Sequence, residues 1–238
     1  MSARQVLQEL KSYAQTGKSH DLQRFFKTGP GEYGEGDIFL GVVVPDTRKV
    51  AKAFSDLSFD EIEKLLASPI HESRLCGLII LTIQYKKDSD ISAQKKVFDF
   101  YVKQLKLGRI NNWDLVDVTA PIIGQYLMTT DDPYKLLTKL AKSKSLWERR
   151  TAIIFTFAFI RAGELDPTIE ISELLLDDSH DLIHKAVGWM LRELGKRDGA
   201  LLRSFLSDHA NNMSRTTLRY AIEKMSVSER KKWLLTTK

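Results

Sequence analysis

The sequence has little of what disulfide-stabilised, zinc-binding and membrane-spanning proteins require. Its 238 residues include one cysteine, Cys76, which excludes a disulfide framework and a cysteine-based zinc site. No apolar run approaches the roughly 18 residues that a membrane span needs. The N-terminal segment, MSARQVLQELKSYAQ, mixes charged and apolar side chains and so resembles neither a signal peptide nor an anchor. We therefore expect a soluble, cytoplasmic protein without a membrane partner.

Strand patterns are also missing, and helical spacing takes their place. No segment alternates apolar and polar side chains, and the GVVVP segment at 41–45 is too short to build a sheet. In residues 180–196 apolar side chains form one helical stripe: Ile183, Val187, Met190, Leu191 and Leu194. Serines and prolines stand near the starts of such runs, as N-caps and first-turn residues do: Ser58, Ser145, Ser179, Ser214, Pro45, Pro69, Pro133 and Pro167. The pattern predicts an all-α protein of about a dozen short helices.

Glycine is concentrated in one segment of the chain. Residues 28–44 hold five of the thirteen glycines, which predicts a long irregular loop. A helical pair over about 2–27 precedes this loop, and an array of helix pairs follows over 45–238. We expect a single domain, 1–238, in which residues 1–44 form an N-terminal cap with its loop.

Three motifs for phosphate or metal binding are incomplete. Residues 29–34 match G-x-G-x-x-G by letter, but no strand precedes them and no helix N-terminus follows directly. Gly17-Lys18-Ser19 ends like a P-loop, but Ser12 stands where the first glycine belongs. His71-Glu72 opens like a zincin helix, yet Leu75 occupies the position of the second histidine. The sequence therefore predicts neither a nucleotide cofactor nor a metal.

Cations recur at related positions in a chain whose net charge of +5 favours a polyanionic partner. Arg74, Arg150 and Lys185 each begin a similar stretch of small and apolar residues: RLCGLIIL, RTAIIFTF and KAVGWMLR. Similar stretches that recur along a chain are typical of stacked helix pairs, because one pair cannot bury its apolar face alone. Coincidence among amphipathic helices is the alternative. A true repeat predicts that these cations form a row on one concave, basic face.

Three tryptophans stand beside charged residues at helical spacing: Trp113 with Asp117, Trp147 with Arg150, and Trp189 with Lys185 and Arg192. Each has an ordinary alternative, since tryptophans at this spacing usually fill a core. Asp117 also suits the positive end of a helix dipole, and Arg150 suits a surface ion pair. Gly188 is harder to explain within one helix, where glycine costs ~1 kcal/mol against alanine. It predicts the close approach of a backbone or a ligand to Trp189's helix.

Four segments together resemble the bacterial DNA alkylation repair family, the AlkD-like alkylpurine DNA glycosylases built of HEAT-like repeats. The segments are WDLVD at 113–117, WERR at 147–150, KAVGWMLRE at 185–193, and FLGVVVP at 39–45 followed by Arg48. The resemblance runs over about 1–236 with the segments in the family's order. It implies a superhelical solenoid of antiparallel helix pairs.

The resemblance also implies an activity and its residues. The activity is hydrolysis of the N-glycosidic bond of cationic alkylated purines, such as N3-methyladenine and N7-methylguanine, in duplex DNA. Asp117 matches the family's catalytic aspartate, and Arg150 matches an arginine that contacts the backbone near the lesion. Trp113 and Trp189 match tryptophans that pack against the damaged nucleotide. Recurring cations are expected to contact DNA phosphates: Arg48, Arg74, Lys185, Arg192, Arg215 and Arg219. Phe25-Phe26 stand where the family has a tyrosine.

One carboxylate suffices for this chemistry. A cationic purine leaves as a neutral molecule and needs no general acid, while a carboxylate can stabilise the oxocarbenium-like sugar and position water. We therefore expect no cofactor, and one array with one groove predicts a monomer. Two alternatives remain open: a HEAT-like DNA-binding module without catalysis, and a protein-interaction scaffold, which the recurring cations favour less.

Overall fold

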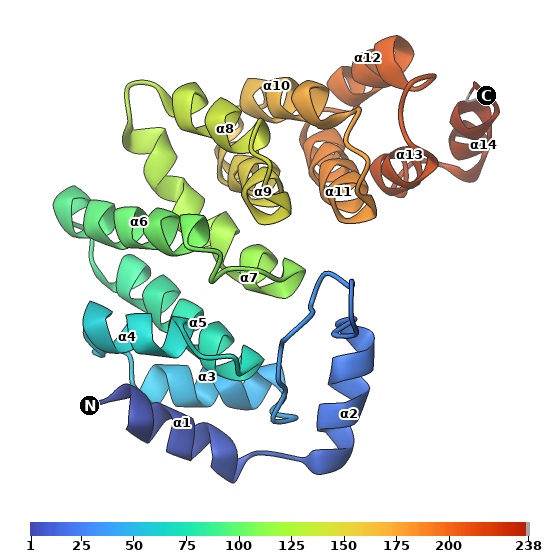
Figure 1. Ribbon diagram of the computed structural model, residues 1–238. Coiled ribbons are helices and arrows are strands. Elements are labelled where there is room, and N and C mark those ends of the chain that lie inside the picture. The colour runs from blue at the N-terminus through green and yellow to red at the C-terminus, as the bar shows by residue number, and fades with distance from the viewer. Residues whose placement is uncertain (237–238) are drawn as a thin grey trace. The chain divides into compact units, whose positions relative to one another are not determined.

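The computed structural model describes residues 1–236 and is built almost wholly of helices (Figure 1). Fourteen α-helices and one short 3-10 helix make up the regular structure of these residues, whose one strand-like pairing is an isolated bridge between Ile38 and Ile70. No helix in this part of the chain is long and apolar enough to cross a membrane. The predicted all-α class is confirmed. The chain forms two compact units that adjoin in sequence at Ile123 and Gly124, and the single domain over 1–238 stays a prediction.

The first unit, Met1–Ile123, is organised around one helix. Its helices are α1 (Ala3–Ser12), α2 (Thr16–Phe25), α3 (Val44–Ala53), α4 (Phe59–Leu66), α5 (His71–Lys87), α6 (Ile91–Lys106) and α7 (Trp113–Ile123). α5 contacts α1, α3, α4, α6 and α7 and is buried along most of its length. Its polar first residues, HESR, are buried as well, which requires hydrogen-bonding or charged partners.

The glycine-rich segment between α2 and α3 is an irregular loop, as predicted, and it attaches α2 to the unit. None of the residues of α2 is buried. The Gln15 amide at its start donates to the Leu40 carbonyl (3.1 Å), and the Ser19 hydroxyl donates to the Phe39 carbonyl (2.6 Å). Only glycine fits at Gly41, where φ is +82° and a Cβ atom would lie 2.1 Å from the Gln15 carbonyl oxygen. Figure 1 shows α2 beside this loop at the edge of the unit.

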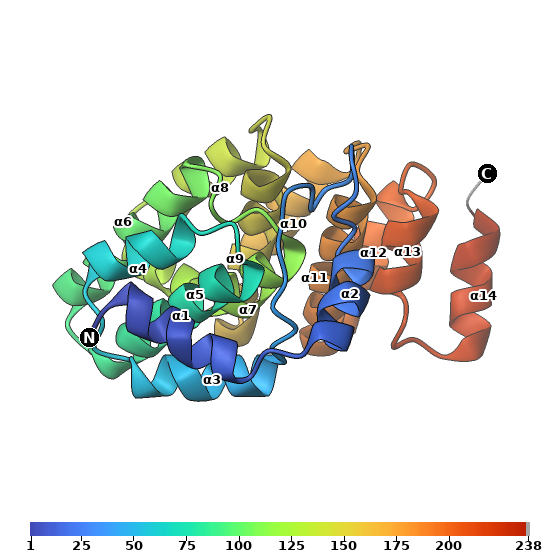
Figure 2. The same ribbon diagram turned by 60° about the horizontal axis from the view of Figure 1, so that its bottom comes forward.

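The second unit begins at Gly124 and consists of stacked helix pairs (Figure 2). Its helices are η1 (Gly124–Thr129), α8 (Pro133–Ala141), α9 (Leu146–Ala162), α10 (Asp166–Leu175), α11 (Asp181–Arg197), α12 (Gly199–His209), α13 (Arg215–Ala221) and α14 (Val227–Thr236). α9 packs on η1, α8, α10 and α11, and α11 packs on α9, α10, α12 and α13. The predicted helix-pair architecture is confirmed.

Helix starts follow the serine pattern with one exception. The hydroxyls of Ser145 and Ser214 cap α9 and α13 by accepting backbone N–H groups. Ser58 occupies the N-cap position of α4 without a side-chain hydrogen bond. For α11 the prediction is wrong: His180, rather than Ser179, is the N-cap, and its Nδ1 atom accepts the Leu182 N–H.

Candidate functional site

The first turn of α7 carries the WDLVD segment and is fixed by a buried asparagine. α7 begins at Trp113, as the sequence predicts. The Asn112 side chain is completely buried; its Oδ1 accepts the Trp113 N–H (2.8 Å), and its Nδ2 contacts the Asp37 carboxylate (3.4 Å). Two carboxylates follow on the helix, of which Asp114 is buried and Asp117 is partly exposed. Asp117 is therefore the more accessible carboxylate of this segment.

Trp113 belongs to an aromatic cluster that joins α7 to the end of α2 and its loop: Phe25, Phe26, Phe39 and Trp113. The Phe26 ring stacks on Trp113 with centroids 5.3 Å apart and planes 17° apart, and it stacks on Phe39 at 5.0 Å. Phe25 meets Trp113 edge-on at 6.0 Å and is 63% exposed. Aromatic pairs of this geometry contribute about 0.5–1.5 kcal/mol each beyond their buried area. The cluster keeps the Trp113 indole in place at the surface of the unit.

Beneath the aromatic cluster lies a buried charge cluster: Asp37, His71, Arg74 and Asp114. His71 Nε2 is 2.8 Å from Asp114 Oδ2, and His71 Nδ1 is 3.1 Å from Asp37 Oδ2. Arg74 reaches the other Asp37 oxygen at 2.5 Å. None of the four residues is more than 8% exposed. The cluster joins the glycine-rich loop, α5 and α7, because one acidic residue comes from the loop and the other from α7.

The buried charges shift the pKa values of two members. Burial alone lowers the pKa of His71, but the Asp114 charge and hydrogen bonds from Asp114 and Asp37 outweigh it and raise that pKa to about 9. Burial alone raises the pKa of Asp37, but the hydrogen bond with His71 and the charge of Arg74 outweigh it and hold the pKa of Asp37 below its usual value. At neutral pH, His71 is therefore an imidazolium between carboxylates.

The one acidic residue of α5, Glu72, holds the glycine-rich loop through the loop's backbone N–H groups. The buried Glu72 carboxylate accepts the N–H groups of Leu40 (3.0 Å), Gly41 (2.9 Å) and Val42 (3.1 Å). Gly34 lies so close to the end of α2 that a Cβ atom would sit 2.5 Å from the Phe26 carbonyl oxygen. The loop is thus a fixed part of the site, held by hydrogen bonds and by a close backbone contact.

In the second unit, Trp189 lies partly exposed on α11 beside Phe157 of α9, whose ring also contacts a cation. Its ring centroid is 5.9 Å from that of Phe157, and the Arg161 guanidinium lies 4.4 Å from the Phe157 centroid. The glycine before it has the close neighbour that the sequence predicts. A Cβ atom at Gly188 would lie 2.5 Å from the Tyr220 Cβ and 2.6 Å from the Thr217 carbonyl oxygen, so the neighbour is α13.

Arg150 and Arg74 differ from the expected row of surface cations. Arg150 is 4% exposed, and its guanidinium donates to the carbonyl of Leu182 at the start of α11. Arg74 is 6% exposed, and its guanidinium forms an ion pair with the Asp37 carboxylate. Burial without a partner costs a guanidinium about 3–5 kcal/mol, and each of these two side chains meets an interior acceptor. Each guanidinium joins two segments of its own unit, and its expected role as a phosphate contact stays a prediction.

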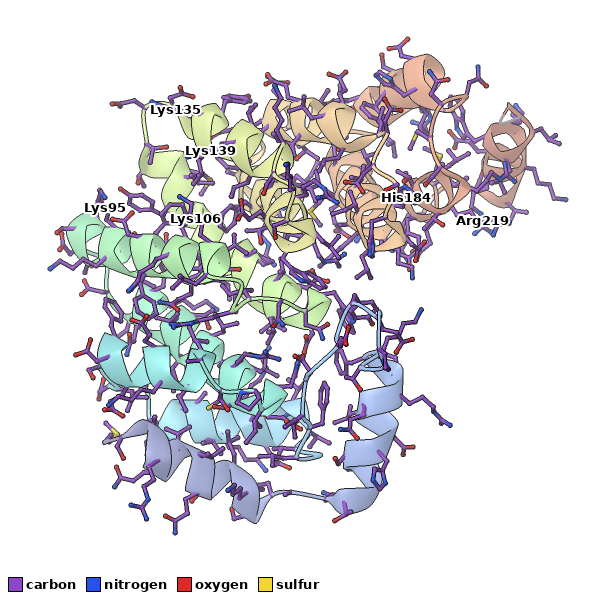
Figure 3. The ribbon with its side chains drawn as sticks, viewed as in Figure 1. Lys95, Lys106, Lys135, Lys139, His184 and Arg219 are labelled. Carbon is purple, nitrogen blue, oxygen red and sulfur yellow. The ribbon has the colours of Figure 1, made fainter. Side chains whose placement is uncertain are left out.

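The remaining predicted cations are more accessible, though two of them are paired. Lys185 pairs with Asp181 (2.7 Å), and Arg192 pairs with Glu223 and with Glu193 (3.4 Å). Arg215 donates to the Leu234 carbonyl from an exposed position. Arg48 on α3 and Arg219 on α13 are exposed, and Figure 3 labels Arg219 on the surface of its helix.

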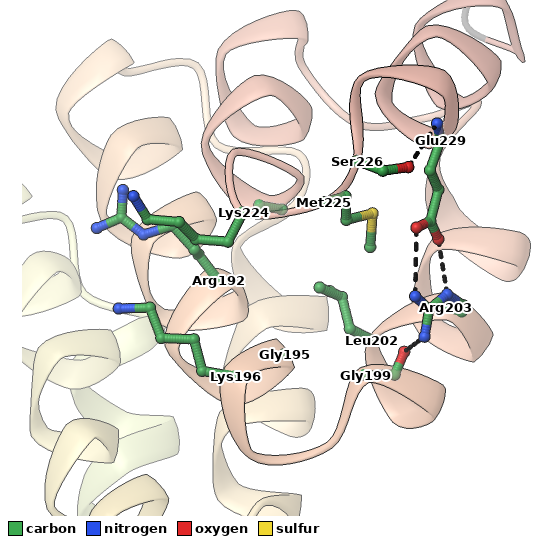
Figure 4. Close-up of a pocket in the computed structure, with 11 residues that line it drawn as sticks. Arg192, Gly195, Lys196, Gly199, Leu202, Arg203, Lys224, Met225, Ser226 and Glu229 are labelled. Atoms are coloured by element: carbon green, nitrogen blue, oxygen red, sulfur yellow. Dashed lines mark hydrogen bonds and ion pairs between the residues drawn. The ribbon is translucent and has the colours of Figure 1, made fainter.

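Arg192 also lines a cavity of about 500 Å³ among α11, α12, α13 and the segment that leads to α14 (Figure 4). Lys196 and Lys224 end on the same side as the Arg192 guanidinium, while the ion pair of Arg203 with Glu229 (2.6 Å) bounds the opposite side. Of the charged residues that line this cavity, four are cationic and one is anionic. Each of the four cations also pairs with a glutamate, Glu193, Glu223 or Glu229, so most of this positive charge is compensated within the unit.

The structure thus places the predicted residues in two groups. Trp113 and Asp117 lie on one helix of the first unit, next to the two clusters described above. Arg150 and Trp189 lie on the packed helices α9 and α11 of the second unit. Sequence reasoning missed Asp37, His71 and Asp114, although two signals were present: acidic residues in a glycine-rich loop, and a polar HESR turn ahead of an apolar helix.

Comparisons with known proteins agree with this architecture. A family model described as DNA alkylation repair enzyme matches residues 6–225. A solved structure described as a predicted DNA alkylation repair enzyme from Enterococcus faecalis has a TM-score of 0.71 at 13% identity, covering 90% of this chain and 97% of that one. A second is described as a new family of proteins related to the HEAT-like repeat DNA glycosylases with affinity for branched DNA structures. Its TM-score is 0.55 at 12% identity, covering 93% of this chain and 83% of that one.

A search of curated proteins finds no match. The two solved structures show that the fold is of the HEAT-like helical kind. Because the family model matches most of the sequence, this chain belongs to the DNA alkylation repair enzyme family.

Proposed function

We propose that the protein is a DNA glycosylase that releases cationic alkylated purines, such as N3-methyladenine and N7-methylguanine, from duplex DNA. One observation carries the proposal: the two carboxylates of the WDLVD turn differ in burial. Asp114 is buried, with one oxygen at His71 and the other accepting the Leu115 N–H (2.8 Å). Asp117 lies one turn after Trp113 and is partly exposed. Membership of the repair family supports the same reading.

In this proposal Asp117 acts on the sugar. As the glycosidic bond breaks, positive charge develops at the anomeric carbon, and a nearby carboxylate stabilises it electrostatically. The same carboxylate orients or deprotonates the water that attacks this carbon. The leaving purine carries its own positive charge and departs neutral, so neither a general acid nor a cofactor is required. Trp113 and Trp189 would offer aromatic faces to the cationic nucleotide, an interaction of about 0.5–2 kcal/mol.

This chemistry predicts strong selectivity for charged lesions, which tests the proposal directly. We expect the wild-type protein to release N7-methylguanine and N3-methyladenine from duplex DNA at least about a hundredfold faster than the neutral base hypoxanthine, because only the cationic bases leave without protonation. Single-turnover release, corrected for spontaneous loss of the methylated bases, measures the difference. Equal rates for charged and neutral lesions would overturn this mechanism.

Cations with partly or fully exposed side chains are proposed to bind the DNA backbone: Arg48, Lys185, Arg192, Arg215 and Arg219. Each phosphate contact releases counterions, so binding weakens as salt rises, with little dependence on sequence. We expect Arg219→Gln to reduce the slope of log K against log salt by about one. The matched control is Lys139→Gln, because Lys139 is an exposed lysine of α8 in the same unit (Figure 3). Equal slopes for both variants would remove Arg219 from the interface.

A DNA-binding protein without catalysis is the second candidate, and one comparison favours it. The solved structure with a TM-score of 0.55 belongs to proteins described by their affinity for branched DNA. Binding to duplex or branched DNA with no release of any alkylated purine would support this candidate. A monomer of the bacterial cytoplasm suits both candidates.

A further inference from the structure

His71 occupies the point at which three segments of the first unit meet. Its ring contacts Asp37 of the glycine-rich loop and Asp114 of α7, while the residue itself opens α5. Each ring nitrogen faces a carboxylate oxygen. A neutral imidazole has one N–H and one acceptor nitrogen, and an ionised carboxylate only accepts. Two carboxylates are satisfied together when both ring nitrogens carry hydrogen.

The charges around His71 balance when its ring is protonated. Asp37 and Asp114 supply two negative charges, and Arg74 supplies one positive charge through the second Asp37 oxygen. An imidazolium supplies the other positive charge. Asp37 of the loop and Asp114 of α7 contact the ring, and Arg74 of α5 contacts Asp37. Without that proton the cluster would hold an uncompensated negative charge in the interior, which is costly.

Two paths lead from this ring to the α7 residues of the proposed site. The first runs through Asp114, which contacts His71 by its carboxylate and follows Trp113 directly in the chain. The other is aromatic: the Phe26 centroid lies 5.0 Å from the His71 ring and 5.3 Å from the Trp113 ring. Phe39 also stacks on His71, at 4.5 Å. A cationic ring is attracted to such aromatic neighbours, which adds to the hold on both sides.

We propose that His71 is a positioning residue: with both ring nitrogens bonded to carboxylates, it holds the glycine-rich loop to the first turn of α7 and so sets the orientation of Trp113 and Asp117. Its effect on purine release rests on the proposed function, whereas its effect on Trp113 does not. His71 is 2% exposed and both of its nitrogens are engaged, so it does not exchange protons with a substrate.

The first experiment follows the wild-type protein by NMR from about pH 6 to about pH 10. The readouts are the ¹⁵N shifts of the His71 ring and the indole N–H signal of Trp113, assigned with Trp113→Phe. We expect both His71 nitrogens to stay protonated at neutral pH and the Trp113 signal to move as the ring loses its proton near its pKa of about 9. The proposal would be overturned by a neutral His71 ring at pH 7, or by a Trp113 indole signal that stays in place while the His71 ring loses its proton.

Stability should follow the same titration. The pKa of His71 is raised from 6.5 in the unfolded chain to about 9 in the folded protein. Its contribution to folding is therefore complete below about pH 6.5 and is lost as pH rises through about 9. Urea unfolding should show this loss in the wild type and not in His71→Gln. A parallel dependence in both proteins would contradict the role assigned to the imidazolium.

A variant separates positioning from general structure. In folded His71→Gln, we expect a shifted Trp113 signal, unshifted signals from the other three tryptophans, and purine release slowed by roughly tenfold to a hundredfold. His209→Gln, which removes a partly exposed histidine paired with Glu173 on α10, is the matched control and should leave both readouts unchanged. If His71→Gln fails to fold, the wild-type titration still decides. If the wild type releases no purine, the Trp113 signal decides alone.

Discussion

Asp117→Asn is expected to slow the release of N7-methylguanine from duplex DNA by about a hundredfold to a thousandfold while DNA binding persists. The substitution keeps the size of the side chain and its capacity for hydrogen bonds, and it removes only the charge that stabilises the sugar cation. Asp117 is partly exposed, so the substitution is made at a position that solvent reaches. Single-turnover release and equilibrium binding to the same labelled duplex measure the two effects.

The matched control is Asp208→Asn, because Asp208 is an exposed aspartate of α12 in the second unit. It should release the base at the wild-type rate. If Asp117→Asn retains the wild-type rate as well, the catalytic assignment of Asp117 falls. If it loses binding together with release, Asp117 acts in recognition rather than on the sugar.

Gly188→Ala is expected to destabilise the second unit by about 2 kcal/mol, although alanine usually stabilises a helix interior by ~1 kcal/mol relative to glycine. The reason is the close contact of α11 with α13. The new Cβ atom would lie 2.5 Å from the Tyr220 Cβ and 2.6 Å from the Thr217 carbonyl oxygen, distances that non-bonded atoms do not tolerate. Since neither neighbour is the end of a flexible side chain, the two helices must separate. Urea unfolding followed by tryptophan fluorescence measures the change.

Gly17→Ala provides the control for this prediction. Gly17 lies in the first turn of α2, and no heavy atom stands within 4 Å of a Cβ atom built there. The same substitution should therefore leave stability unchanged or raise it slightly. A Gly188→Ala variant as stable as the wild type would show that α11 and α13 are not as tightly packed as described.

The fold was predictable because its signals are local. Helical stripes, serine caps and the glycine-rich interruption each depend on a few neighbouring residues, and the structure confirms nearly all of them. In α9, the local pattern predicts the helix but not how much of its surface is buried. A stripe of Leu146, Ile153, Phe157 and Ile160 predicts one buried face, yet the helix is buried nearly all round because α8, α10, α11 and η1 surround it.

The site was predictable only in part, for a physical reason. Trp113 and Asp117 lie on one helix, so their spacing in the sequence reports their proximity. Asp37, His71 and Asp114 come from three separate segments, and nothing in the spacing of these residues indicates that they meet. Arg74 illustrates the converse error: its place in a repeat suggests a surface cation, whereas the buried Asp37 carboxylate determines where its guanidinium goes.

The buried charge cluster has a consequence for how this sequence can diverge. Four charges from the loop, α5 and α7 compensate one another in the interior. Changing any one of them alone leaves a buried charge without a partner of opposite sign, at a cost of roughly 3–5 kcal/mol. Replacing all of them together with well-packed apolar residues need not be unfavourable. Substitutions at Asp37, His71, Arg74 and Asp114 should therefore be strongly epistatic. Among descendants of this chain, the four positions are expected to be inherited and lost as a set, even though none of them contacts the substrate in the proposed chemistry.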